Sequence, residues 1–171
     1  MRRKCSRVGI GYDIHRLAEG RELWLGGVQV PYHMGLVGHS DADVLLHAIC
    51  DALLGAAALG DIGYHFPDTD PQYKGINSQR LLQEVAKLVR SEGYVVGNVD
   101  SVIVTEQPKL QAFIPEMRSV IANILEIPES DVSVKASTNE RLGDIGKGEG
   151  IMALTNVMIH PQDDLCPDSA L

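Results

Sequence analysis

One carboxylate and two imidazoles in the first third of the chain have the chemistry to hold a metal ion. Asp13 and His15 are two residues apart after the strand-like run 7–12, so on an extended chain their side chains point to the same face. His47 lies within the helix-like run 41–51. Three such ligands leave the fourth tetrahedral position of a zinc ion open, as in catalytic zinc sites. The spacing also allows a second interpretation, since a histidine on an apolar helix is more often a hydrogen-bonded core residue.

The residues around His47 have two interpretations each. His39, Ser40 and Asp41 come directly before the helix, where Ser40 or Asp41 is expected to cap it. A loop histidine such as His39 also reaches ligands more often than a core residue does. Asp51, one turn beyond His47, either orients that imidazole or is simply a polar helix position.

The segment 61–75 is long for a loop in a compact domain and is rich in Gly, Pro and Asp. Its acidic residues fit ordinary turn chemistry, but loops of this length often serve as lids or binding loops. Phe66, one of two phenylalanines in the chain, either packs inward or closes over a ligand.

Two further segments have phosphate-binding chemistry. After the strand-like run 132–137, Ser137, Thr138 and nearby backbone N–H groups can hold phosphate oxygens, and Glu140 can bind a cation such as Mg²⁺. The alternative is a capping cluster of a short turn. The strand-to-helix turn 105–109 places Lys109 near an expected helix N-terminus, a plausible anion site. The glycine-rich run 146–150 lacks the P-loop order, so a nucleoside triphosphatase is not indicated.

Composition narrows the function classes. The chain has 171 residues, 44% hydrophobic and 22% charged, with a net charge of −8. This acidity argues against nucleic-acid binding, which needs a basic surface. The three cysteines are widely spaced and indicate neither a disulfide framework nor a thiolate metal site. No secretory signal and no membrane span is expected, because charged or polar residues interrupt every apolar run.

These residues must be positioned by alternating strands and helices. We expect an α+β fold in which a mixed four-stranded sheet carries helices on one face. The single domain covers 1–160, and the acidic segment 161–171 is expected to be a flexible tail. The expected elements are strands at 5–12, 94–105, 132–137 and 151–159, a hairpin at 22–30 around Gly26-Gly27, and helices at about 41–59, 78–92 and 110–125.

The ordered set of motifs resembles the 2-C-methyl-D-erythritol 2,4-cyclodiphosphate synthase family, from about Arg7 to Ile159. The matching motifs are Gly11-Tyr12-Asp13-Ile14-His15, Gly38-His39-Ser40-Asp41-Ala42-Asp43, His47, Asp51 to Ala56, Gly60-Asp61-Ile62-Gly63, Phe66 to Asp70, Gly97 to Asp100, Pro108-Lys109, Lys135 to Glu140 and Gly148 to Ile151.

The resemblance implies a phosphorus–oxygen lyase of the non-mevalonate isoprenoid pathway. Its substrate would be 4-diphosphocytidyl-2-C-methyl-D-erythritol 2-phosphate, and its products the 2,4-cyclodiphosphate and CMP. The resemblance implies a homotrimer with active sites at subunit interfaces, located in the bacterial cytoplasm. It implies zinc on Asp13, His15 and His47, and a second divalent cation, Mg²⁺ or Mn²⁺, on Glu140. His39 and Thr138 match the catalytic positions of the family.

The resemblance also implies the substrate contacts. The metal ligands Asp13 and His15, with His39 and Ser40, would meet the methylerythritol phosphate. The sugar-alcohol pocket would be lined by Asp61, Ile62, Gly63, Phe66, Pro67, Asp68, Thr69 and Asp70. The cytidine diphosphate would be held by Thr105, Pro108, Lys109, Leu110, Gln111, Ser137, Thr138, Asn139 and Glu140.

Two positions in the glycine-rich loop depart from the family pattern. Lys147 stands where the family usually has Arg, which keeps the charge but loses the bidentate fork. Asp144 stands where an apolar residue, often Phe, is usual, near an axial cavity that holds isoprenoid diphosphates in some members. Both are predicted ligand contacts, and the two can also pair with each other, within one subunit or between neighbours.

Two other functions are compatible with parts of the pattern. A zinc-dependent phosphohydrolase acting on a nucleotide-like substrate could use the same ligands, with water as the nucleophile. A binding module for isoprenoid diphosphates would need the metal only for stability, but the presence of Glu140 and Lys109 favours catalysis.

Overall fold

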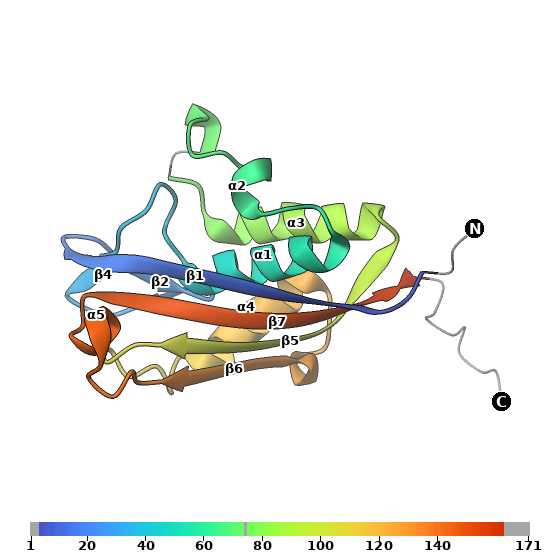
Figure 1. Cartoon of the computed structure of the whole chain (residues 1–171). Helices are drawn as coiled ribbons and strands as arrows, with labels where there is room; N and C mark the ends of the chain where they lie inside the picture. Colours follow the sequence, from blue (N-terminus) through green and yellow to red (C-terminus); the bar gives the residue numbers. More distant parts are fainter. Residues whose placement is uncertain (1–3, 74, 163–171) are drawn as a thin grey trace.

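The scaffold is a mixed sheet of five strands (Figure 1), seen in a computed structural model that describes residues 4–73 and 75–162. The strand order is β4-β1-β7-β5-β6, and all neighbours are antiparallel except the parallel pair β5 and β6. The strands are β1 (Arg7–Glu19), β4 (Met34–Leu36), β5 (Tyr94–Val104), β6 (Val132–Ser137) and β7 (Gly150–Pro161). The predicted α+β class is confirmed, but the predicted number of four strands in the sheet is wrong. The fifth, β4, has only three residues, too few for a visible alternation of apolar and polar side chains.

The hairpin predicted around Gly26-Gly27 is confirmed. It consists of β2 (Leu23–Leu25) and β3 (Val28–Val30), which pair with each other as a separate two-stranded sheet. Beyond Gln162, the predicted acidic tail lies outside the described residues.

Three long helices cover one face of the sheet, as expected (Figure 1). α1 packs on β1 and β7, α4 packs on β6, and α3 packs on both helices. None of the helices in the described part of the chain is long and apolar enough to cross a membrane. The helices are α1 (Val44–Ala57), α2 (Ile62–His65), α3 (Ser78–Ser91), α4 (Ile114–Leu125) and α5 (Gly143–Gly146), with the 3₁₀ turns η1 (Pro71–Tyr73) and η2 (Glu129–Asp131).

The close approach of α1 to β1 depends on two glycines. A Cβ atom added to Gly9 would lie 1.9 Å from the carbonyl oxygen of Ala52, and one on Gly11 would lie 1.9 Å from that of Ala48. Real Cβ atoms do not approach backbone so closely, so only glycine fits at these two positions. The helix backbone therefore rests directly on the strand, next to Asp13.

Several element boundaries differ from the prediction. β1 continues to Glu19, so Asp13 and His15 lie inside the strand and not after it. The N-cap of α1 is Asp43, not Ser40 or Asp41. The N-cap of α3 is Asn77, one of the two residues, with Ser78, whose type favours that position.

The helix expected from residue 110 begins at Ile114, with a proline in its first turn. The turn 105–109 is therefore separated from the helix N-terminus by four residues, and the helix end does not provide the anion site expected near Lys109.

Candidate functional site

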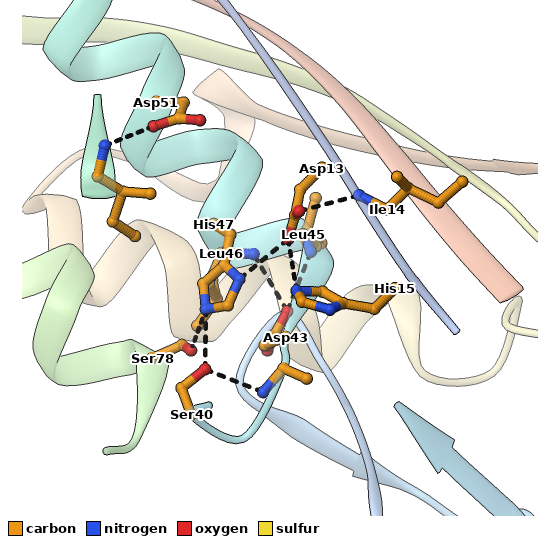
Figure 2. A network of polar contacts seen from close by, with 12 residues as sticks. Asp13, Ile14, His15, Ser40, Asp43, Leu45, Leu46, His47, Asp51 and Ser78 are labelled. Carbon is orange, nitrogen blue, oxygen red and sulfur yellow. Dashed lines mark hydrogen bonds and ion pairs between the residues drawn. The ribbon is translucent and has the colours of Figure 1, made fainter. Parts of the chain in front are cut away.

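The predicted trio forms a cluster where α1 crosses β1 (Figure 2). Oδ2 of Asp13 lies 2.9 Å from Nδ1 of His47 and 3.2 Å from Nε2 of His15. One ligand atom from each of the three residues lies within 4.8 Å of the other two. Asp13 and His15 come from alternate positions of β1, and His47 comes from the first turn of α1. The three ligand atoms are close enough to one another to coordinate a single metal ion.

Hydrogen bonds on the far side of each imidazole determine which nitrogen faces the cluster. Nδ1 of His15 lies 2.7 Å from the carbonyl oxygen of Val37, which can only accept, so this nitrogen carries a proton. In neutral His15, Nε2 then has a free lone pair that is directed at Asp13.

The tautomer of His47 follows from a buried serine. The hydroxyl of Ser78 donates to Asp41, so its oxygen accepts from Nε2 of His47, 2.9 Å away. Ser40 Oγ lies 3.1 Å from the same nitrogen. Nδ1 of neutral His47 therefore also presents a lone pair to the cluster. Two lone pairs and a carboxylate oxygen facing one another repel unless a cation lies between them, so these residues fit a metal ion.

The crowding of these groups shifts the pKa values of Asp13 and His15. Burial alone would raise the pKa of Asp13, but hydrogen bonds and positive charge from His15 and His47 hold it well below its usual range. The hydrogen bond to Asp13 raises the pKa of His15, against the opposing effect of burial. The site thus stabilises positive charge next to Asp13, whether carried by protons or by a metal.

A fully buried carboxylate anchors the start of α1. Asp43 accepts backbone hydrogen bonds from Leu45 and Leu46 in the helix and from Gly26 and Gly27 in the hairpin turn, at 2.7–3.1 Å (Figure 2 shows the helix contacts). Burial raises the pKa of this carboxyl, although these N–H donors oppose the effect. The hairpin and helix are therefore tied together one turn before His47.

Asp51 has a different role from the two that its position suggested. Its Oδ1 accepts from the backbone N–H of Ile62 at 2.8 Å, so it holds the first turn of α2 (Figure 2). Burial raises the pKa of Asp51, and the Ile62 N–H partly offsets this. The residue connects α1 to the segment that was predicted to form a binding loop.

A cavity of about 440 Å³ opens beside the cluster. It brings together the trio with seven other predicted contacts: His39, Ser40, Ile62, Gly63, Phe66, Pro67 and Asp68. The other predicted residues of this loop, Asp61, Thr69 and Asp70, do not line the cavity. Asp61 instead caps α2 through the N–H of Tyr64, and Asp70 accepts from the N–H of Gln72.

Three wall residues were not predicted: Tyr73, Ile76 and Leu81. Tyr73 packs edge-to-face on Phe66 with ring centroids 5.5 Å apart, so the predicted loop aromatic does pack inward as part of the wall. Tyr73, one of two tyrosines in the same polar loop, was a usable signal. Leu81 could only be read as a core position of its helix, because its spacing is that of the apolar stripe.

Several of the other predicted phosphate-binding residues lie near the β6 edge of the sheet. The parallel strands β5 and β6 end side by side, and the N–H of Thr105 donates to the carbonyl of Ser137 at 3.0 Å. The hydroxyl of Thr138 donates to Glu140. Nζ of Lys147, the C-cap of α5, lies 3.2 Å from Oδ1 of Asp144, so the predicted pair forms within one chain.

The metal-ligand cluster on β1 and the residues at the end of β6 are three strand spacings apart across the sheet. Asp13 pairs with Ala153, Ala153 with Ile103, and Ile103 with Ala136. Three strand spacings amount to about 14 Å. Ala153 and Ile103 are fully buried beneath the helices, so a ligand cannot cross between the two groups over this face.

Comparison with known proteins identifies the family. The pattern of the YgbB family matches residues 6–160. The chain belongs to this family. A YgbB relative from Porphyromonas gingivalis strain W83, named 2-C-methyl-D-erythritol 2,4-cyclodiphosphate synthase, is 60% identical over 88% of this chain and 93% of its own.

Solved YgbB structures share the fold. The bifunctional IspDF of Campylobacter jejuni is 44% identical with a TM-score of 0.88, over 91% of this chain and 42% of that larger chain. IspF of Plasmodium falciparum, in complex with CDP, is 34% identical with a TM-score of 0.82, over 94% of this chain and 99% of its own. The resemblance of the motifs to the cyclodiphosphate synthases is thus confirmed.

Proposed function

We propose that this protein is a 2-C-methyl-D-erythritol 2,4-cyclodiphosphate synthase of a bacterial cytoplasm. The substrate is 4-diphosphocytidyl-2-C-methyl-D-erythritol 2-phosphate. An oxygen of the 2-phosphate attacks the β-phosphorus, the bond from that phosphorus to the bridging oxygen breaks, and CMP leaves with the oxygen. The observation that carries the proposal is the cluster of Asp13, His15 and His47 beside a cavity, in a chain 60% identical to a protein of that name.

The residues on the β1 side bind the attacking half of the substrate. Asp13, His15 and His47 are the residues that would hold Zn²⁺. When bound there, zinc polarises and orients a phosphate oxygen as a Lewis acid. His39, Ser40 and the wall residues of the α2 loop position the methylerythritol phosphate.

No general base is required for this reaction. The 2-phosphate is already an anion near neutral pH, so the task of the site is to bring two anions together in line. Ser40 lines the cavity 3.1 Å from Nε2 of His47, but this nitrogen carries the proton that it donates to Ser78, so it cannot act as a general base on Ser40.

The residues at the ends of β5 and β6 bind the leaving half. Thr105, the segment 108–111 and the segment 137–140 hold the cytidine and its phosphates. Glu140 would hold the second cation, Mg²⁺ or Mn²⁺, and Thr138 and His39 would stabilise the transition state. A CDP complex of the Plasmodium falciparum relative supports a cytidine nucleotide ligand for this fold.

The active form is a homotrimer with each site shared between two chains. A substrate that contacts both groups must bridge two subunits, because the strands β7 and β5, with buried Ala153 and Ile103, separate the groups within one sheet. The face of the sheet opposite the helices supports this assembly, since its β1 side chains are apolar and exposed: Val8 71%, Ile10 66%, Tyr12 52% and Ile14 45%. Three copies packed by this face would bury these side chains.

Isotope labelling tests the reaction itself. Incubation of the purified protein with the substrate, Zn²⁺ and Mg²⁺ in H₂¹⁸O is expected to yield CMP and the cyclic diphosphate in equal amounts, without ¹⁸O in either product. Phosphorus NMR and mass spectrometry measure both. A linear bisphosphate carrying ¹⁸O would establish the phosphohydrolase instead, because its nucleophile is water.

A further inference from the structure

Between Thr138 and Leu142 the chain makes a bend that its residue types do not favour. Glu140 has φ 50° and Arg141 has φ 64°, two consecutive left-handed residues that are not glycine. Such a conformation is unfavourable for L-residues and persists only where neighbouring groups hold it. The bend determines where the side chains of Thr138 and Glu140 point.

One carboxylate oxygen of Glu106 provides the holding contact. Oε1 of Glu106 accepts from the backbone N–H of Asn139 at 3.0 Å and from that of Arg141 at 3.1 Å. These two amides flank Glu140. Within the bend, the side chain of Asn139 also donates to the carbonyl of Leu142 at 2.7 Å.

The two amides form a small concave donor site of the kind that binds anions. Backbone N–H groups in this segment were expected to hold phosphate oxygens. For Asn139 and Arg141, the acceptor is Glu106 from the end of the neighbouring strand. The hydroxyl of Thr138 points instead to Glu140.

We propose that Glu106 is a positioning residue, which holds the bend so that Thr138 and Glu140 face the phosphates of the substrate. This inference rests on the proposed function and adds a residue that contacts neither substrate nor metal. Glu106 acts as a double hydrogen-bond acceptor, so a neutral acceptor of the same length can replace it. Gln satisfies this requirement and Ala does not.

Amide hydrogen exchange of the protein without ligand tests the contact directly. In Glu106→Ala, the amides of Asn139 and Arg141 are expected to exchange at least about tenfold faster than in the wild type, because their acceptor is gone. In Glu106→Gln they stay within about threefold of the wild type. Glu116→Ala, which removes an exposed carboxylate from the first turn of α4, is the matched control and leaves both amides unchanged.

Kinetics separate positioning from a purely structural role. Glu106→Ala is expected to lower kcat by about 10–100-fold and to raise the Mg²⁺ or Mn²⁺ concentration needed for half-maximal rate, with bound zinc and thermal stability unchanged. Glu106→Gln is expected to keep both kcat and the half-maximal metal concentration close to their wild-type values.

Two results would overturn the inference. One is a Glu106→Ala protein with wild-type amide exchange and wild-type metal dependence. The other is a Glu106→Gln protein as impaired as Glu106→Ala, which would mean that the charge of Glu106 matters and not its acceptor oxygen. Failure of the wild-type protein to form cyclic product is a separate outcome: it would refute the proposed function, while the exchange rates depend only on the bend without ligand.

Discussion

At the scale of single residues, the atoms that could bind a metal are oriented by groups behind them. The carbonyl of Val37 accepts a hydrogen bond from the outward-facing nitrogen of His15. The hydroxyl of Ser78, which donates to Asp41, accepts one from the outward-facing nitrogen of His47. This leaves an inward-facing lone pair on both rings, directed at Asp13. The metal affinity of the site should therefore depend on these partners as well as on the three ligands.

The first prediction removes a ligand. His47→Ala is expected to lose bound zinc and with it turnover, because two protein ligands hold the ion poorly. Metal analysis by mass spectrometry after dialysis measures the zinc. Full zinc occupancy in this variant would contradict the assignment of His47.

The second prediction removes the group that orients a ligand. Ser78→Ala takes away the nearer of the two hydroxyl oxygens beside Nε2 of His47, at 2.9 Å against 3.1 Å for Ser40, and zinc affinity is expected to fall about 10–100-fold. Competition with a chromophoric chelator measures the affinity, and nitrogen shifts of His47 report its tautomer. Ser91→Ala makes the same chemical change at the last residue of α3 and serves as the control. Equal zinc affinity in Ser78→Ala and wild type would refute the role of Ser78.

At the scale of elements, the site depends on how closely α1 lies on β1. Gly9 and Gly11 leave no room for a side chain beneath Ala52 and Ala48. Since His47 directly precedes Ala48, the spacing at Gly11 fixes the distance between His47 and Asp13.

The third prediction tests this spacing. Gly11→Ala is expected to lower the free energy of unfolding by roughly 1–3 kcal/mol, because its Cβ forces strand and helix apart. Zinc affinity should fall with it. Urea denaturation measures the stability. Gly55→Ala on α1 is the control, because a Cβ there meets nothing closer than 3.9 Å, and stability should rise by about 1 kcal/mol. Similar stability of Gly11→Ala and wild type would show that the contact is not tight.

The sequence predicts elements well where periodicity or capping is strong. The helix α3 has both an apolar stripe and its Asn77 cap, and its prediction is confirmed. The boundaries of β1 and α4 were wrong. The apolar alternation of Val8, Ile10, Tyr12 and Ile14 breaks at Arg16, although the strand continues to Glu19, and Pro115, not Pro108, lies in the first helical turn. The trio was predicted by residue type. The cap at Asp43 was not, because its hairpin donors are 16 and 17 residues away in the chain.

At the scale of the whole molecule, one chain contains two groups of predicted site residues that do not meet. The cluster on β1 and the bend after β6 are separated by the strands β7 and β5, with buried Ala153 and Ile103 between them. Burial of the exposed apolar side chains of β1 in a trimer would remove them from water and would place the edges of neighbouring chains side by side. Assembly and catalysis would then depend on the same surface.

The last prediction uses two inactive variants with defects in different half-sites. His47→Ala damages the β1 half, and Lys109→Ala damages the half at the end of β5. In trimers reassembled from an equal mixture, a site that takes the β1 half from a Lys109→Ala chain and the other half from a His47→Ala chain is intact. Random assembly makes roughly one quarter of the sites intact, so activity should return to about that fraction of the wild type. Mixing His47→Ala with Asp13→Asn, which damages the same half, should restore nothing. A cyclising enzyme that stays monomeric by light scattering during turnover, or a cross-half mixture that stays inactive after verified subunit exchange, would show that each site belongs to a single chain.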